Sequence, residues 1–362
     1  MVPTDPVDPG PLVDLLRGLV ELESPTGDTG AMAERMAAEL EQRGAKTRRL
    51  DEHVLAELDG QEPPLLVLGH LDTVWDRGAL ERLPFRLENG RAYGPGSYDM
   101  KGGLVVLLAA LDAAGDDRRA VRVFLNADEE IGSPTGREHI PEAAEGVSAA
   151  FVVEPPLASG GLKTARKGLG RFRVSVTGRL AHAGTNLADG ANAIEELAHQ
   201  ILGLQSLTDP ERGRSVNVGI VRGGTRENVV PDLAEADLDI RVSRASDVYE
   251  LEELFGGLTT TVPGTEVAVT GRWTRPPLER SAGAARLFAK AREHGRGLGL
   301  ELTEGSSGGG SDGNLVGALG IPVLDGLGAE GAGAHAPDEH VVLDSLPVRA
   351  GLLARLLRDP GL

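Results

Sequence analysis

The stretch GGLVVLLAALDAAGDDRRAVRVFLNADEE (102–130) decides the fold class of this chain. Residues 102–115 are almost wholly apolar and have the length of a helix, whereas 121–127 form a short apolar run of strand length. A helix that is apolar all round must be buried, and a strand without alternation is covered on both faces. The stretch therefore predicts one helix and one strand of an α/β layer, and it ends in two adjacent carboxylates, Glu129 and Glu130.

The same alternation extends on both sides of this stretch, from about residue 11 to residue 165. Further helical patterns are PLVDLLRGLVEL (11–22) and AMAERMAAELEQRG (31–44), and further apolar runs are PLLVLGH (64–70) and AAFVVEP (149–155). Helices that alternate with uninterrupted apolar strands are typical of a mixed, largely parallel sheet covered by helices. We therefore predict an α/β layer around such a sheet.

From residue 171 the pattern changes to the order β-α-β-β-α-β. The successive segments are 171–179, 189–207, 215–224, 234–243, 247–262 and 265–273. This order predicts an inserted α+β domain of the split-βαβ, ferredoxin-like type. The first pattern then resumes. Its segments are a helix (282–295), a glycine-rich loop SSGGGSDGNL (306–315), the apolar run IPVLDG (321–326) and a last helix (345–357). We predict a discontinuous first domain, 1–168 and 275–362, with 169–274 inserted.

Composition and charge exclude several classes of protein. The chain has 362 residues, a formal charge of −18 and no cysteine, so a metal would have to be held by His, Asp and Glu. The basic cluster ARKGLGRFR (165–173) is too short for a nucleic-acid footprint, and we expect no nucleic-acid partner. We also expect no membrane association, because no run approaches about 18 apolar residues. The N-terminus lacks a signal-peptide pattern, so we expect a cytoplasmic protein.

Residues able to bind a metal follow the apolar runs of the first domain. They are His70, Asp72, Glu129, Glu130, Glu154 and, beyond IPVLDG, His335, and Asp99 joins them from the loop GPGSYDMKGG. The carboxyl ends of strands are where open α/β sheets bind ligands. Burying several carboxylates together is costly unless a cation lies among them. These residues therefore predict a metal site, and their number favours two metal ions.

The chain also resembles the zinc-dependent carboxypeptidase and deacylase family that includes glutamate carboxypeptidase, acetylornithine deacetylase, succinyl-diaminopimelate desuccinylase and aminoacylase. The resemblance covers nearly the whole chain and looks closest to the glutamate carboxypeptidase branch. The motifs that carry it are GHLDTVW (69–75), YGPGSYDMKGG (93–103), NADEEIGS (126–133), VVEP (152–155), ARKG (165–168), GRLAHAG (178–184), GGTRENVVPDLAEADLDIR (223–241), GGGSDGN (308–314) and GAHAPDEHV (333–341).

The resemblance implies a role for each candidate residue of the first domain. Asp99 would bridge two divalent metal ions, His70 and Glu154 would complete one position, and Glu130 and His335 the other. Glu129 would be the general base that activates a metal-bridging water and passes the proton to the leaving amine. Asp72 would fix the ring of His70, with a helix-capping role as its alternative. Zinc is the first expectation, although such ligands also accept cobalt or manganese. The family also holds the peptide after the bridging aspartate, here Asp99–Met100, in cis.

The resemblance also makes the inserted domain a lid and dimerisation domain. His182 would reach across a homodimer to stabilise an oxyanion in the other subunit, and Asn228 and Arg241 would hold a substrate carboxylate. GGGSDGN is either a flexible loop or a lining of the substrate pocket, where Gly309 and Ser311 would contact substrate. The remaining histidines are His53, His139, His199, His294 and His340; we expect surface positions for them, with His340 a candidate to support His335.

The expected function is a dinuclear metal-dependent amidohydrolase that cleaves an amide beside a free carboxylate. Its substrate would be a small peptide-like molecule or an N-acyl amino acid. Two alternatives stay open from the sequence. One is a catalytically silent ligand-binding or regulatory homologue, and the other is an amide-forming or acyl-transfer enzyme on the same scaffold.

Overall fold

The structure is a computed structural model that describes residues 9–362, and contacts divide the chain into two compact units. Among the described residues, the first unit comprises 9–165, Arg280–Ser307 and Ser311–Leu362, and the second comprises Arg166–Glu279 and Gly308–Gly310. Our predicted first domain included Gly308–Gly310, whereas the contacts group these three residues with the second unit. The expectation about a signal peptide falls mainly on residues 1–8, outside the described part.

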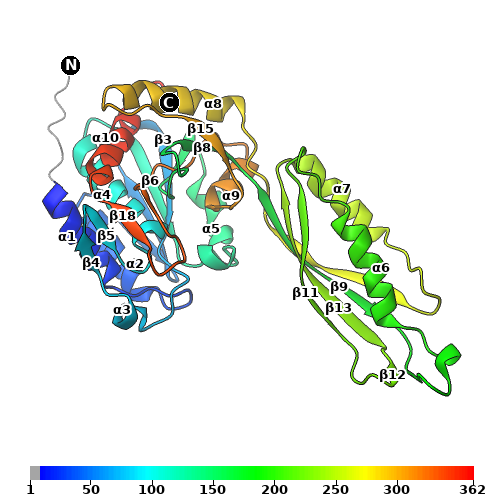
Figure 1. The fold of residues 1–362 in the computed structure, drawn as a ribbon. Coiled ribbons are helices and arrows are strands. Elements are labelled where there is room, and N and C mark those ends of the chain that lie inside the picture. Colours follow the sequence, from blue (N-terminus) through cyan, green and yellow to red (C-terminus); the bar gives the residue numbers. More distant parts are fainter. Residues whose placement is uncertain (1–8) are drawn as a thin grey trace. The chain divides into compact units, whose positions relative to one another are not determined.

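A six-stranded sheet forms the centre of the first unit (Figure 1). Its order is β1 (Lys46–Leu50), β2 (His53–Leu58), β6 (Arg119–Asn126), β3 (Gln61–His70), β7 (Ala149–Val152) and β16 (Val323–Leu324). The last four strands are parallel neighbours, and β1 and β2 join as an antiparallel hairpin. The prediction of a mixed, largely parallel sheet is confirmed. The β1–β2 hairpin was not predicted, because KTRRL is a mostly exposed edge strand without an apolar pattern.

Helices cover both sides of this sheet (Figure 1). Helix α4 (Gly102–Ala114) packs against α10 (Ser345–Leu357) and β3. Helix α1 (Pro9–Val20) also contacts α4. Helix α2 (Gly30–Glu41) packs against β1 and β2. Helix α5 (Gly136–Ala143) contacts β6, α9 (Asp312–Ala318) contacts β7, and α8 (Ala282–Arg296) contacts β16. Helix α3 (Ala79–Arg82) is a single short turn.

The start of α4 lies unusually close to the sheet. A Cβ atom built at Gly103 would lie 1.9 Å from the carbonyl oxygen of Val153, so only glycine fits there. Nearly all of α4 is buried, as its apolar sequence predicts. This close approach holds the loop before α4, which carries Asp99, beside the carboxyl end of β7.

Short strands that the sequence did not reveal complete the first unit. A second antiparallel sheet has the order β17 (Gly331–Ala332), β18 (His340–Val342), β5 (Arg91–Tyr93) and β4 (Arg86–Glu88). In addition, β8 (Leu162–Arg166) pairs with β15 (Glu304–Ser307). Strands of two to five residues carry too little periodicity to be recognised. The second sheet joins the motifs around Tyr93 and His340, which are far apart in sequence.

The second unit contains β9 (Gly168–Thr177), α6 (Ala193–Gln205), β11 (Ser215–Gly223), β13 (Leu233–Val242), α7 (Ala245–Gly256) and β14 (Glu266–Arg275). This is the predicted β-α-β-β-α-β order. The four long strands form an antiparallel sheet in the order β11-β13-β9-β14, and α6 and α7 pack against the sheet (Figure 1). A small ladder of β10 (Ala181–His182) and β12 (Val229–Val230) lies apart from this sheet.

A buried carboxylate ties α6 to the chain that precedes β14. Glu196 is fully buried, and it accepts hydrogen bonds from the N–H groups of Thr261 and Val262 at 2.7 Å and from Nε2 of Gln200 at 2.6 Å. Burial raises the pKa of Glu196, but the hydrogen bonds outweigh it and hold the pKa below its ordinary value. The ionised carboxylate therefore stabilises the second unit.

We predict that Glu196→Ala lowers the free energy of unfolding of the second unit by roughly 2–3 kcal/mol near neutral pH, because two backbone N–H groups and the buried amide of Gln200 lose their acceptor. Urea denaturation measures this loss, and Glu195→Ala, an exposed neighbour on the same helix, is the control. The pKa of Glu196 is lower in the folded protein than in the unfolded chain. The stabilisation is therefore fully present above the pKa of the unfolded state, and it is lost as the pH falls through the pKa of the folded state. A difference between wild type and Glu196→Ala that stays constant on acidification would contradict this account.

Candidate metal centre

His70 lies at the end of β3 with one ring nitrogen committed to its own chain. Its Nδ1 donates to the backbone carbonyl oxygen of Asp72 at 2.9 Å, which leaves Nε2 as the nitrogen that faces the site. Nε2 lies 3.2 Å from Oδ1 of Asp99 and 3.5 Å from Oε1 of Glu154. The side chain of His70 is only 2% exposed. The tautomer and direction of the ring are those of a metal ligand.

Asp99 lies between two imidazoles. Its Oδ1 faces His70, and its Oδ2 lies 3.4 Å from Nε2 of His335. His335, which adopts a left-handed backbone with φ 63°, also lies 3.4 Å from Oε2 of Glu130. The peptide Asp99–Met100 is cis, as the family resemblance predicted. Each carboxylate oxygen of Asp99 is thus directed at a different histidine.

Glu129 and Glu130 do not lie on a strand. Strand β6 ends at Asn126, and the two glutamates lie in a 3-10 turn, Glu129–Ile131. Their different directions therefore come from the turn and not from the alternation of a strand. Ligand atoms of His70, Asp99 and Glu130 all lie within 4.8 Å of one another, and so do those of His70, Glu129 and Glu154. The turn places one glutamate in each group.

The side chain of Asp72 makes contacts that were not predicted. Its Oδ1 and Oδ2 accept the N–H groups of Glu129 and Glu130, both at 3.1 Å, and Oδ2 also accepts the hydroxyl of Thr26 at 2.8 Å. Its carboxylate lies 3.4 Å from Nδ1 of His70, farther than the backbone carbonyl oxygen of the same residue. Asp72 therefore holds the turn of the two glutamates. Its carboxylate and its carbonyl oxygen both lie beside Nδ1 of His70, and its role in fixing that ring stays a prediction.

The charges of the site favour a cation. Burial lowers the pKa of His70, but Asp72, Asp99 and Glu154 outweigh it and raise the pKa well above its ordinary value. Hydrogen bonds with Asp99 and Glu130 raise the pKa of His335 to about 10. Oε1 of Glu130 is buried and has no hydrogen-bond partner within residues 9–362. An acceptor without a donor, in a group of carboxylates and inward-facing imidazoles, fits divalent cations with oxygen and nitrogen ligands.

A buried polar network supports the glutamate turn from behind, and sequence reasoning missed it. Asp312 accepts Nδ2 of Asn126 at 2.7 Å and the hydroxyl of Ser133 at 2.6 Å, so it holds both ends of the segment NADEEIGS. Asp312 belongs to GGGSDGN, whose pattern indicated only a loop. The polar pair Asn126 and Ser133 around Glu129 was the available signal.

Ser311 was predicted to contact substrate, and that role stays a prediction. The residue is fully buried at the start of α9, where its hydroxyl accepts the N–H of Gly313 at 3.1 Å and donates to Asp325 at 2.6 Å. Asn314 completes a capping box. Ser311 is therefore a helix cap, and the second half of the predicted glycine-rich loop is helical.

His182 and Asn228 lie together in the second unit. His182 pairs with Val229 between β10 and β12, and the N–H of Ala183 donates to the carbonyl oxygen of Asn228 at 3.1 Å. Nδ1 of the exposed His182 ring accepts the N–H groups of Gly184 and Thr185 at 3.0 and 3.2 Å. Nε2 consequently carries the proton and is available as a donor.

Arg241 of β13 is held by residues of its own unit. Its Nε and Nη2 donate to the carboxylate of Asp239 at 2.8 and 3.1 Å, and Nη1 donates to the carbonyl oxygen of Gly308 at 2.9 Å. The carbonyl oxygen of the next residue, Gly309, accepts a hydrogen bond from Arg166. Arg241 is thus oriented beside the glycine-rich segment, with Asp239 sharing its donors.

The histidines outside the site are not all on the surface as predicted. His53 is 2% exposed, stacks on Phe124, accepts the N–H of Ala127 at 3.0 Å and contacts the hydroxyl of Thr135. It is a satisfied core histidine. His340 contacts the carbonyl oxygen of Asp338 and the ring of Tyr93, and no contact with His335 is found among the described residues.

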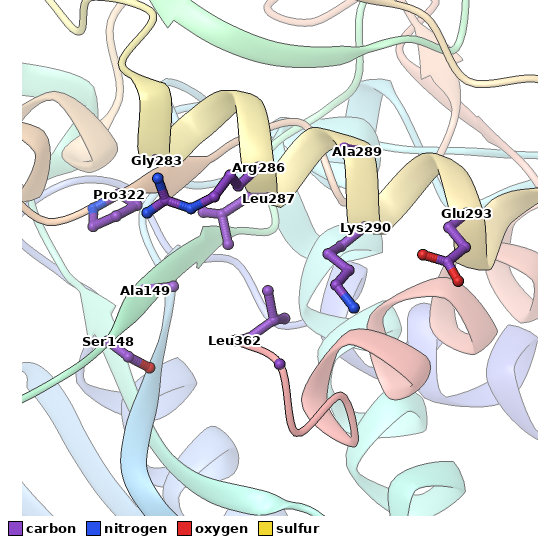
Figure 2. Close-up of a pocket in the computed structure, with 11 residues that line it drawn as sticks. Ser148, Ala149, Gly283, Arg286, Leu287, Ala289, Lys290, Glu293, Pro322 and Leu362 are labelled. Carbon is purple, nitrogen blue, oxygen red and sulfur yellow. The ribbon is translucent and has the colours of Figure 1, made fainter.

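A cavity of about 330 Å³ lies elsewhere in the first unit, between α8 and the beginnings of β7 and β16 (Figure 2). Its lining includes Ala149, Pro322, Arg286 and Lys290. It lies at the amino ends of parallel strands, whereas His70 and Glu154 follow the carboxyl ends. No histidine lines it, so it is separate from the candidate metal centre.

The chain combines a two-unit α/β fold with groups of His, Asp and Glu that could hold a metal ion, and comparison with known families gives its class. Residues 66–359 match the model of Peptidase family M20/M25/M40. The chain belongs to this family. No helix within residues 9–362 is long and apolar enough to cross a membrane.

Relatives with similar sequences span nearly the whole chain. Carboxypeptidase G2 of Pseudomonas sp. (strain RS-16) is 31% identical, over 97% of this chain and 89% of that protein. A succinyl-diaminopimelate desuccinylase of Stenotrophomonas maltophilia is 29% identical, over 96% of this chain and 98% of that protein. The first relative is thus named as a carboxypeptidase and the second as a desuccinylase.

Solved structures share the fold at lower identity. A tripeptidase from Staphylococcus aureus is 20% identical with a TM-score of 0.83, over 98% of this chain and 99% of that one. An M20 family metallo-carboxypeptidase from Sulfolobus solfataricus is 20% identical with a TM-score of 0.73, over 96% of this chain and 98% of that one. The two-unit architecture is therefore that of M20 peptidases.

We predict that His335→Ala lowers the metal content of the protein and weakens binding at one position by at least about tenfold, because an imidazole facing two carboxylates is removed. Elemental analysis after dialysis, followed by chelator competition, measures both quantities. His340→Ala is the matched control, since its ring lies in the same segment but contacts Tyr93. Equal metal content and affinity in His335→Ala and His340→Ala would contradict the prediction.

Proposed function

We propose that this chain is a dinuclear metal-dependent amidohydrolase that cleaves an amide bond beside a free carboxylate. The observation that carries the proposal is the carboxylate of Asp99, whose two oxygens face two different imidazoles at 3.2 and 3.4 Å. A bridging ligand between two cations needs this arrangement. Glu154 beside His70 and Glu130 beside His335 give each side one further carboxylate.

The two cations would share Asp99. His70 and Glu154 would hold one cation, and Glu130 and His335 the other. The donor set of imidazole and carboxylate without sulfur suits zinc, and it also accepts cobalt or manganese. When bound, such ions polarise a carbonyl group and make water a nucleophile at neutral pH.

Glu129 would act as the general base. Its carboxylate groups with His70 and Glu154, while Asp72 holds its backbone N–H, so its position is fixed by the turn and not by a flexible loop. Glu129 would take a proton from the attacking water and donate it to the nitrogen of the leaving amine. The C–N bond breaks as the new C–O bond is completed, and the products are a carboxylic acid and an amine.

Three residues of the second unit would bind the rest of the substrate. The Nε2–H of His182 would donate to the developing oxyanion, which agrees with the tautomer set by Gly184 and Thr185. Arg241 and Asn228 would hold the free carboxylate, and the backbone at Gly309 would line the same region. The names of the relatives, a carboxypeptidase, a desuccinylase and a tripeptidase, favour peptide-like or N-acyl amino acid substrates.

We predict that Glu129→Gln keeps the fold and both metal ions but lowers kcat by about 100- to 10,000-fold, because it removes the base and no metal ligand. Activity is measured on a panel of N-acyl amino acids and dipeptides with metal-loaded protein. Glu138→Gln, on α5 and exposed, is the control and keeps wild-type turnover. Turnover by Glu129→Gln close to that of wild type would rule out this base.

The proposal includes a homodimer in which His182 of one subunit completes the site of the other. We predict that His182→Ala and Glu129→Gln chains are each nearly inactive alone. After subunit exchange, a mixed dimer contains one site with both groups, and activity returns to roughly half the wild-type rate per mixed dimer. If mass analysis shows exchange and no activity returns, His182 acts within its own chain or not at all.

A further inference from the structure

Glu339 is a buried carboxylate for which the proposed reaction has no use. Its side chain is buried, with the residue only 2% exposed, and its two oxygens accept hydrogen bonds from four N–H groups. Oε1 accepts the backbone N–H groups of Tyr98 and Asp99, both at 3.0 Å. Oε2 accepts the N–H of Gly96 at 2.9 Å and the indole Nε1–H of Trp75 at 2.8 Å. Every strong acceptor direction of the carboxylate is therefore used.

These donors all belong to the segments that form one side of the metal centre. Gly96, Tyr98 and Asp99 form the loop in front of α4, and Trp75 follows the segment that begins with His70. Asp99 is the residue whose carboxylate faces both imidazoles. A carboxylate that binds the N–H of Asp99 itself fixes the backbone from which that side chain projects.

The backbone of Glu339 also belongs to the loop that carries His335. Within this loop the N–H of Ala336 donates to Gly333 at 2.8 Å, and the N–H of Glu339 donates to Ala336 at 3.0 Å. The loop is so compact that a Cβ atom at Gly333 would lie 2.9 Å from Cα of Glu339. The backbone of Glu339 is thus hydrogen-bonded to Ala336, the residue next to His335.

We propose that Glu339 is a positioning residue that fixes Asp99 and His335 relative to each other and thereby sets the affinity and ligand geometry of the metal site they would share. The inference rests on the proposed function, because it assumes that cations bind at Asp99. Asp99 and His335 are 236 positions apart in sequence, and the side chain of Glu339 joins their two loops directly.

The two acceptor oxygens of Glu339 matter as well as its shape. Hydrogen bonds to an ionised acceptor are shorter and stronger than neutral ones, and a carboxylate can accept four. In Glu339→Gln one oxygen becomes an NH2 group, which would face two N–H donors. One pair of bonds is lost, and either the loop of Asp99 or the indole of Trp75 must move. The simple alternative is that Glu339 only stabilises the fold, in which case metal binding would not change.

The test compares Co²⁺ binding to metal-free wild type, Glu339→Gln and Glu196→Gln. Glu196 is the matched control, since it is also a buried carboxylate held by N–H donors but lies in the second unit. Chelator competition gives the Co²⁺ dissociation constants, the visible Co²⁺ spectrum reports ligand geometry, and thermal unfolding reports stability. We expect Glu339→Gln to weaken Co²⁺ binding by about 10- to 100-fold and to change the spectrum. Glu196→Gln should lower only the unfolding temperature.

The outcomes separate this inference from the proposed function. Wild-type protein that binds no Co²⁺ would overturn the proposed function and this inference with it. Wild type that binds Co²⁺, together with a Glu339→Gln protein of unchanged affinity and spectrum, would overturn this inference alone, even if Glu339→Gln unfolds at a lower temperature. If Glu339→Gln does not fold, Glu339→Asp decides: its carboxylate is one methylene short, and we expect at least about tenfold weaker binding with an altered spectrum. Unchanged binding in Glu339→Asp would then overturn the inference.

Discussion

The structure of the first unit depends on one electrostatic constraint, the gathering of four carboxylates around two inward-facing imidazoles. Asp99, Glu129, Glu130 and Glu154 cannot share this space as anions without positive charge among them. The neighbouring carboxylates raise the pKa values of His70 and His335. Protons on the two rings thereby supply positive charge to the site. Divalent cations would supply more charge and would satisfy the buried Oε1 of Glu130. We therefore regard the fold around this site as organised to hold cations.

The backbone of the ligand segments is held by a second layer of carboxylates. Asp72 accepts the N–H groups of the Glu129–Glu130 turn, Glu339 accepts those of the Asp99 loop, and Asp312 holds the ends of NADEEIGS. Asp72 and Glu339 accept main-chain N–H groups, whereas Asp312 accepts the side chains of Asn126 and Ser133. Such outer partners orient the ligands that they support. Removing one such acceptor should therefore affect the geometry of the site before it affects the fold.

The sequence predicted those parts of the molecule that carry a long or repeated pattern. The apolar stretch that became α4 and β6, the parallel sheet and the β-α-β-β-α-β order of the second unit all follow from periodicity. Short strands such as β17 were missed, because two residues have no period. Pairing of Glu339 with Asp99, or of Asp312 with Asn126, depends on contacts between distant segments and leaves no local signal. The helix start at Ser311 was not predicted, because a glycine-rich motif gives no helical pattern. The short turn of Glu129 directly follows a strand and has no pattern of its own.

The presence of two cations sharing Asp99 is the central claim, and anomalous diffraction from crystals of the zinc-loaded protein tests it most directly. We predict two anomalous peaks about 3.5–4 Å apart. One peak should lie beside His70, Asp99 and Glu154, and the other beside Asp99, Glu130 and His335. A single peak, or peaks that do not contact Asp99, in crystals grown with excess zinc would contradict the account.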